Sequence, residues 1–141
     1  MREAVRFTLP GGRARALLLR PSWEAYGEIE TAIEASLPQI YRGHALLQLR
    51  LRDTAQIVAI GANAHTPGSA EVESVERRLY ELGPAADGPR AEIGRFLLAL
   101  MYAPEEARKK AAEEWPATAA EEAAASGAAA HSSSRSSGSP S

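Results

Sequence analysis

Alternating apolar and polar residues at the start of the chain predict a β-hairpin. Val5, Phe7 and Leu9 alternate with polar residues, so the strand expected at residues 4–9 has one apolar and one polar face. The sequence PGG separates it from a second expected strand at residues 13–19, and its glycines can adopt the positive φ angles of a tight turn. Because an isolated hairpin is marginally stable in water, its apolar face requires a cover.

The following segment predicts a helix that supplies this cover. Ser22 can cap a helix that begins at the next residue, and Pro38 ends its regular pattern. Apolar residues recur at steps of three and four and so share one helical face. These residues are Trp23, Tyr26, Ile29, Ile33 and Leu37. We expect the two aromatic residues to pack against Phe7 and Leu18; the alternative is that they anchor a partner protein.

Residues 42–53 are ambiguous. Leu47, Leu49 and Leu51 alternate with polar residues, which fits a third short strand or an extended connector. Asp53, followed three residues later by Gln, resembles a capping box that starts a helix continuing to Ala64.

Two further amphipathic helices and one polar helix are predicted in the second half. Ser69 is expected to cap a helix with apolar residues at 72, 75, 79 and 82, which Gly83 ends. A helix from about Pro89 follows, with its apolar face formed by Ile93, Phe96, Leu97, Leu100 and Met101. The segment at 104–115 is almost wholly polar, so we expect it to project into solvent or to bind a partner.

These elements predict an α+β fold that is mostly α, with an N-terminal hairpin packed on a bundle of about four helices. The hairpin and bundle form one small domain at residues 1–103, followed by a polar helical extension at 104–116. The Ala- and Ser-rich tail at 117–141 is expected to be disordered. Hydrophobic residues make up 45% of the chain, but 29 of them are Ala, so a thin core without a large cavity is expected.

Composition argues against several classes of function. The net charge of −2 gives no general attraction for nucleic acid or for an anionic membrane. The chain has no Cys, so thiol catalysis and thiolate metal sites are excluded. The absence of Cys is consistent with a protein of a reducing compartment. No apolar run approaches the roughly 18 residues of a membrane span, so we expect a cytoplasmic protein.

Catalytic chemistry is not expected either. His44, His65 and His131 are the only histidines, and none lies at metal-ligand spacing from another ligand; we expect structural roles for the first two at a loop or helix end. Ser22 lies outside a nucleophile elbow. Four glutamates share the helix that starts at residue 23 and are interpreted as a solvated face; they are Glu24, Glu28, Glu30 and Glu34. The prediction is a non-enzyme without catalytic residues, cofactor or metal.

The phrase LRPSWEAYGEIE, at residues 19–30, carries a family resemblance. It is similar to a phrase of the small tail assembly chaperones of tailed phages and gene transfer agents, specifically the gene transfer agent type, often labelled tail tube or tail assembly proteins. The matching residues are Leu19, Arg20, Pro21, Ser22, Trp23, Ala25, Glu28, Ile29 and Glu30. Weaker matches are the step at residues 51–53 and Gly61, and the resemblance covers residues 4 to about 103.

The resemblance implies a binding function without chemistry. Members of the family bind the long helical tape measure protein in the host bacterium during virion assembly and are absent from the finished particle. A tape measure protein, or another phage tail protein, is therefore the expected partner; self-association is left open. Because shielding apolar helical faces requires semi-exposed apolar residues, we expect the contacts at Phe96, Leu100, Met101, Tyr102 and Trp115.

Two other functions compete with this interpretation. A structural tail component, such as a tube or connector subunit, would require longer strands than the sequence predicts. A small DNA-binding regulator would use a basic strip formed by Arg13, Arg15, Arg20, Arg50 and Arg52, and its retention on DNA would depend on salt.

Overall fold

The computed structural model describes residues 2–9 and 15–116 and confirms an α+β fold that is mostly helical. The tail at 117–141 and the hairpin turn lie outside the described residues. The elements in chain order are β1 (Val5–Leu9), β2 (Arg15–Leu19), α1 (Trp23–Ile33), α2 (Leu37–Ala45), α3 (Leu51–His65), α4 (Val72–Leu82), α5 (Asp87–Met101) and α6 (Pro104–Glu114). The prediction lacked α2.

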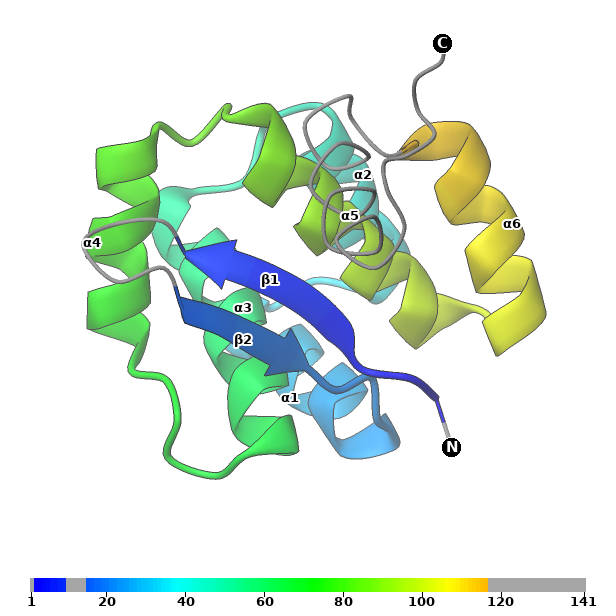
Figure 1. Cartoon of the computed structure of the whole chain (residues 1–141), viewed down its shortest axis with the longest axis horizontal. Coiled ribbons are helices and arrows are strands. Elements are labelled where there is room, and N and C mark those ends of the chain that lie inside the picture. Colours follow the sequence, from blue (N-terminus) through cyan, green and yellow to red (C-terminus); the bar gives the residue numbers. More distant parts are fainter. Residues whose placement is uncertain (1, 10–14, 117–141) are drawn as a thin grey trace, which may run out of the picture.

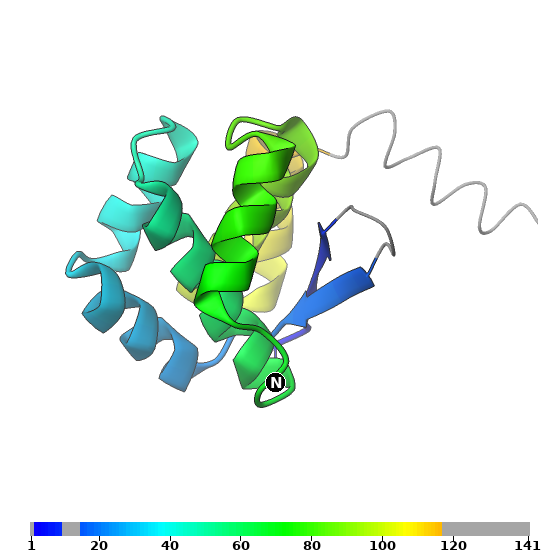
Figure 2. The ribbon, with the colours of Figure 1, turned by 90° about the vertical axis from the view of Figure 1, so that its left-hand side faces the viewer.

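The hairpin packs its apolar face on two helices that are distant in sequence. β1 and β2 pair antiparallel with Phe7 opposite Leu17, and Phe7 and Leu19 are fully buried. β1 contacts α5 and β2 contacts α3, while α1 and α2 cover the far side of these helices (Figures 1 and 2). The predicted hairpin and its need for a cover are thus confirmed, but α3 and α5 supply the cover in place of α1.

Helix α1 buries only part of the stripe that predicted it. Ala25, Ile29 and Ile33 are buried, whereas Trp23 is 85% exposed. The predicted packing of Trp23 against Phe7 and Leu18 is wrong. Because a residue turns about 100° along a helix, two steps of three residues place Trp23 about 120° away from Ile29.

The break between α1 and α2 explains why the sequence did not predict α2 and left residues 42–53 ambiguous. Glu34 ends α1 in the left-handed conformation, with φ of 63°. Ser36 and Gln39 then form a capping box, and the Glu30 carboxylate accepts a hydrogen bond from the Leu37 amide at 2.8 Å. Pro38 lies in the first turn of the new helix, where proline is favoured. A third strand at 42–53 is therefore wrong, and only residues 46–50 form a connector.

The later helices follow the predicted stripes but not the predicted caps. Val75 and Leu79 are buried on α4 as expected. Asp53 does not cap α3, which begins two residues earlier, and its carboxylate pairs with Arg50 at 2.9 Å. The Ser69 hydroxyl does not cap α4 but donates to a carbonyl oxygen of α3 at 3.1 Å. Local capping patterns therefore located these helices to within a few residues and assigned the wrong side-chain partners.

A close approach between β2, α3 and α5 holds the layers together. Gly61 on α3 faces both Phe96 and Leu19, and a Cβ atom at this position would lie 2.7 Å from Phe96 Cζ and 3.1 Å from Leu19 Cβ. The Arg20 amide donates to the Gly61 carbonyl oxygen at 3.0 Å. A side chain at position 61 would separate the hairpin from the helices.

We predict that Gly61→Ala lowers the free energy of unfolding by about 1–3 kcal/mol, because the new methyl group must displace the packed Phe96 ring. Urea unfolding measures the change. The control is Gly27→Ala on α1, where no atom of the described residues beyond the local helix backbone lies within 4 Å of the added Cβ. This control should gain up to about 1 kcal/mol from helix propensity. Equal effects of the two substitutions would contradict the close approach.

Candidate functional site

The side chains predicted to bind a partner are mostly covered by the chain itself. Phe96 and Leu100 are buried in the core, and Trp115 is only 7% exposed. Met101 and Tyr102 are half-buried. The expected semi-exposed face is wrong for the three buried residues. Phe96 and Leu100 are covered by the core that includes Phe7 and Leu19, and Trp115 is covered because α6 folds back on α5 instead of projecting into solvent.

Trp115 fixes the end of α6 against α2 and α5. Its ring occupies the space that a side chain at Gly94 would need, since a Cβ there would lie 2.3 Å from a ring carbon. Its indole N–H donates to the Tyr41 hydroxyl at 2.7 Å, and the Arg90 guanidinium lies 5.0 Å from the ring centroid. Trp115 is therefore a structural anchor.

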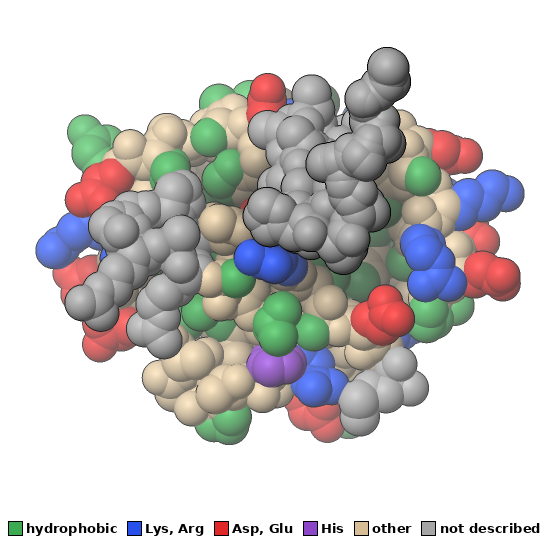
Figure 3. Space-filling model, in the orientation of Figure 1, with side chains coloured by type: hydrophobic (Ala, Val, Ile, Leu, Met, Phe, Trp, Pro, Cys, Tyr) green, Lys and Arg blue, Asp and Glu red, His purple; other side chains and the backbone are tan. Residues whose placement is uncertain are grey.

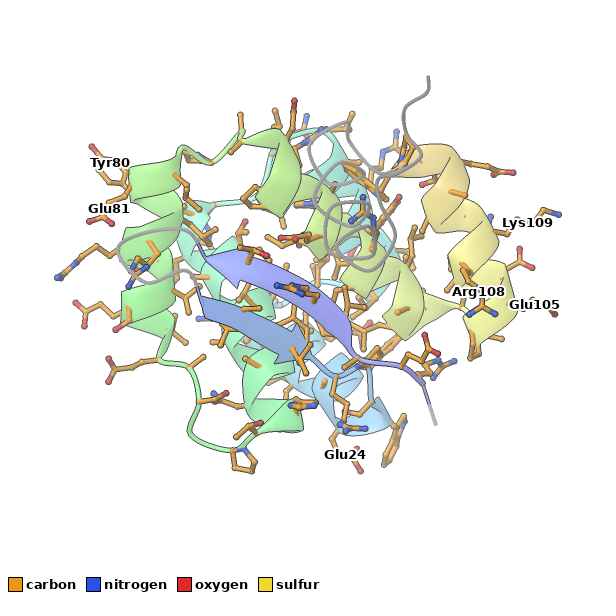
Figure 4. All side chains as sticks on the ribbon, viewed as in Figure 1. Glu24, Tyr80, Glu81, Glu105, Arg108 and Lys109 are labelled. Carbon is orange, nitrogen blue, oxygen red and sulfur yellow. The ribbon has the colours of Figure 1, made fainter. Side chains whose placement is uncertain are left out.

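The outward face of α6 is charged. Glu105, Arg108 and Lys109 point away from the domain (Figure 4), and side chains of both signs gather along this edge (Figure 3). This mixture is typical of a solvated helix face, so the outward face of α6 is not an apolar surface for a partner.

Two titratable groups beside Trp115 are held neutral. The His44 Nε2–H donates to the Arg90 carbonyl oxygen at 2.8 Å. Burial, together with the charge of Arg90, lowers the pKa of His44. Burial and the carboxylate of Glu114, to which the hydroxyl donates, raise the pKa of Tyr41. The expected helix-end role of His44 is confirmed, because it lies in the last turn of α2.

An apolar pocket of about 230 Å³ lies between the α2–α3 and α4–α5 connectors and is called the loop pocket below. It is lined mainly by aliphatic residues, with polar groups from three side chains. The aliphatic lining includes Leu47, Leu49, Leu51, Leu79, Pro84 and Ile93. His44, Thr54 and Arg90 supply the polar groups. The pocket is smaller than the roughly 300–1,000 Å³ typical of small-molecule sites.

Leu47, on the rim of the loop pocket, combines backbone strain with exposure. Its φ of 57° places it in the left-handed region, and its side chain is 54% exposed. The Leu47 amide donates to the carbonyl of residue 44 at 3.1 Å, and the Gln48 amide donates to that of residue 43 at 2.7 Å. This pattern is a Schellman motif, whose left-handed position normally holds Gly. Leu47 belongs to neither core cluster of the described residues, so core packing does not explain a large apolar residue there.

A second apolar surface lies along α1 and is called the α1–α3 groove. It is an open depression lined by Trp23, Tyr26 and Gly27 of α1 and by Ile60 of α3, together with Glu24, Glu28, Glu30, Thr31 and Ala32. The exposed Trp23 stands at one end of it. Two features of the sequence could have indicated this groove: an aromatic residue at the edge of the apolar stripe, Trp23, and an isolated glycine inside a helical pattern, Gly27.

Most of the phrase that carries the family resemblance is structural. Ser22 caps α1 by accepting from an amide at 3.0 Å, Arg20 donates its amide to α3, and Glu30 accepts from the first amide of α2. The buried members are Leu19, Pro21, Ala25 and Ile29. Trp23 and Glu28 are exposed and make no such contact. Among the residues that match the family phrase, these two positions are the ones open to a partner.

Among the described residues, the other candidate side chains do not come together in a binding or metal site. Arg50 pairs with Asp53, and Arg52 pairs with Glu76 at 3.1 Å, so part of the expected basic strip is neutralised. Within residues 2–9 and 15–116, no group of three or more His, Cys, Asp or Glu side chains could hold a metal ion. In the same part of the chain, no helix has the length and apolar character needed to cross a bilayer.

Comparison of the chain with protein-family models, with curated proteins and with solved structures found no match. Its function is therefore argued from the loop pocket and the α1–α3 groove.

The neutral state of His44 predicts a stability that depends on pH. The unfolded chain binds a proton at His44 near pH 6.5, and the folded chain resists it, so stability is complete above that pH and falls as the pH is lowered. We expect the free energy of unfolding to fall by up to about 1.4 kcal/mol per pH unit from this group.

The measurement is urea unfolding of the wild type and His44→Gln between about pH 5 and 7, above the range in which most carboxylates titrate. The variant should be less stable at pH 7 and should lose most of this slope. His65→Gln, in which a half-buried histidine at the end of α3 is replaced, is the matched control and should keep the slope. Parallel curves for the wild type and His44→Gln would contradict the assignment.

Proposed function

We propose that this chain is a tail assembly chaperone of a tailed phage or gene transfer agent. It binds the tape measure protein in the cytoplasm of the host bacterium and keeps it soluble until the tail tube encloses it. The observation that carries the proposal is the loop pocket with Leu47 on its rim, an apolar surface that the described chain leaves uncovered. The resemblance of residues 19–30 to this family also supports the proposal.

The pocket suits a helical protein partner better than a small substrate. Its volume of about 230 Å³ and its aliphatic lining match single apolar side chains of a helix. An amphipathic helix array exposes many such side chains, and covering them prevents aggregation. Leu47, which protrudes at the rim, supplies additional apolar contact area. The local backbone strain is then explained by the contact, since strained positions are retained where function needs them.

Under this proposal the chain acts by contact alone, takes no cofactor and leaves before the particle is complete. The competing function is a structural tail subunit, which would remain in the particle. Mass spectrometry of purified particles separates the two functions. A chaperone is expected to be absent, whereas detection in a fixed ratio to other tail proteins would support the structural subunit.

We predict that Leu47→Gly stabilises the fold and impairs the function. Glycine removes the cost of a left-handed leucine, so the free energy of unfolding should rise by roughly 0.5–1 kcal/mol. The variant also removes the apolar contact at the rim. When this chain is co-expressed with the tape measure protein of its own gene cluster, we expect the soluble fraction of that protein to fall severalfold.

Glu34→Gly is the matched control. It makes the same backbone change at the other non-glycine residue with positive φ in the described part of the chain, at the end of α1 and outside the loop pocket. It should stabilise the fold similarly and leave the partner soluble. If the tape measure protein is equally soluble with wild type, Leu47→Gly and Glu34→Gly, the loop pocket does not bind it. If it is insoluble with all three, the chaperone function itself is contradicted.

A further inference from the structure

The α1–α3 groove presents an aromatic residue that the fold does not use. Trp23 is 85% exposed at the first turn of α1, although its neighbours Tyr26 and Ile60 are half-buried against the core. Large aromatic residues dominate the energy of protein interfaces, because they bury much area at a low entropy cost. Trp23 therefore has the exposure and size of an interface anchor.

Every charged residue that lines this groove is acidic. Glu24, Glu28 and Glu30 line it, and none of the described lining residues is Lys or Arg. Glu24 and Glu28 are exposed, and Figure 4 shows Glu24 directed away from the domain. A partner segment that covers Trp23 must lie beside these carboxylates, so complementarity of charge selects a basic segment.

Gly27 allows that segment to approach closely. It lies in the middle of α1, four residues after Trp23, where glycine lowers helix stability. Beyond the local helix backbone, none of the described residues comes within 4 Å of the position of its missing Cβ, so their packing does not require glycine. A neighbouring helix can contact the backbone of α1 at this point, as small residues permit between packed helices.

We propose that the α1–α3 groove binds a basic amphipathic helix, with its apolar row over Gly27 and Ile60, its Lys or Arg residues beside Glu24 and Glu28, and Trp23 packed on its apolar side chains. That this helix belongs to the tape measure protein rests on the proposed function. The basic amphipathic character rests on the groove alone. The groove and the loop pocket share no lining residue, so the two contacts can be tested separately.

The experiment measures binding of the full chain to two labelled peptides of about 20 residues, long enough to form a helix on binding. They share one apolar row and carry either Lys or Glu at the flanking positions. By fluorescence anisotropy we expect the Lys peptide to bind at least tenfold more tightly than the Glu peptide. Raising NaCl from about 50 to 500 mM should weaken the Lys peptide severalfold. Equal affinity for the two peptides would overturn the proposal.

Gly27→Leu is the most informative variant. It should not lower the melting temperature, since leucine is the better helix former and the site is open. It should weaken the Lys peptide at least tenfold, because the side chain blocks the approach of the helix. Trp23→Ser should act in the same direction, and the control Leu18→Ser replaces an exposed apolar residue on the outer face of the hairpin. Unchanged binding by Gly27→Leu and Trp23→Ser would overturn the proposal.

A second pair of variants tests the charges. Glu24→Gln with Glu28→Gln should weaken the Lys peptide, whereas Glu73→Gln with Glu81→Gln on α4 makes the same change of charge outside the groove and should not. If both double variants weaken the Lys peptide equally, the glutamates act only through the overall negative charge of the protein. This result would contradict a direct contact at Glu24 and Glu28. A different outcome is that the chain self-associates, that Gly27→Leu abolishes this self-association, and that the Lys peptide does not bind. This outcome would identify a second copy of the chain as the occupant of the groove and would also overturn the proposal.

The same variants separate this proposal from the proposed function. If the tape measure protein is kept soluble in a manner that depends on Leu47, but the Lys peptide does not bind, this proposal fails and the chaperone function stands. If the Lys peptide binds in a manner that depends on Trp23 and Gly27, while the tape measure protein is never solubilised, the groove assignment stands and the chaperone function fails.

Discussion

The absence of a side chain at Gly61 is the constraint on which the arrangement of the layers depends. A hairpin of two five-residue strands cannot hold an apolar face in water, so Phe7 and Leu19 must be covered by helices. Two helices from distant parts of the chain reach this face together, because α3 can approach β2 and the Phe96 ring of α5 at the same point. The hydrogen bond between the Arg20 amide and the Gly61 carbonyl fixes the exit of the hairpin. α1 and α2 are then left to cover the far side of α3 and α5, and this position directs the outer face of α1 to solvent.

A closed interior places any binding function at the surface, and two surface residues cost stability without a reason inside the described chain. Gly27 weakens an exposed helix, and Leu47 occupies a left-handed position that glycine would fill at lower cost. Glu34 has the same backbone conformation, but the turn from α1 into α2 explains it. Gly27 and Leu47 each lie beside an exposed apolar surface, which makes contact with another molecule the more economical explanation. Stability and binding are then in conflict at the same two positions.

Periodicity predicted the hairpin, α4 and α5, because each of these elements buries one continuous row of apolar residues. It failed where the burial of a residue is decided by geometry over a longer range. Trp23 belongs to the row by spacing but rotates out of it, and Pro38 was interpreted as a stop although Ser36 and Gln39 cap a new helix there. The burial of Trp115 could not be predicted locally, since the space for its ring is created by Gly94 on another helix. The loop pocket was missed with α2, because Leu47 has a special conformation only at the end of that helix.

The polar sequence of α6 raises the question of what holds it to the domain. Only Ala107 is buried along the helix itself, so apolar area contributes little to its attachment. Trp115 at its end supplies the missing contact, through its ring in the space at Gly94 and its hydrogen bond to Tyr41. The guanidinium of Arg95 adds a hydrogen bond to the Trp115 carbonyl oxygen at 3.1 Å. A polar helix held at its end packs beside Ala91, Leu98 and the edge of α5 and directs charged side chains to solvent (Figure 4). The loop pocket and the α1–α3 groove are lined by none of the five residues that the sequence alone had favoured for contact with a partner.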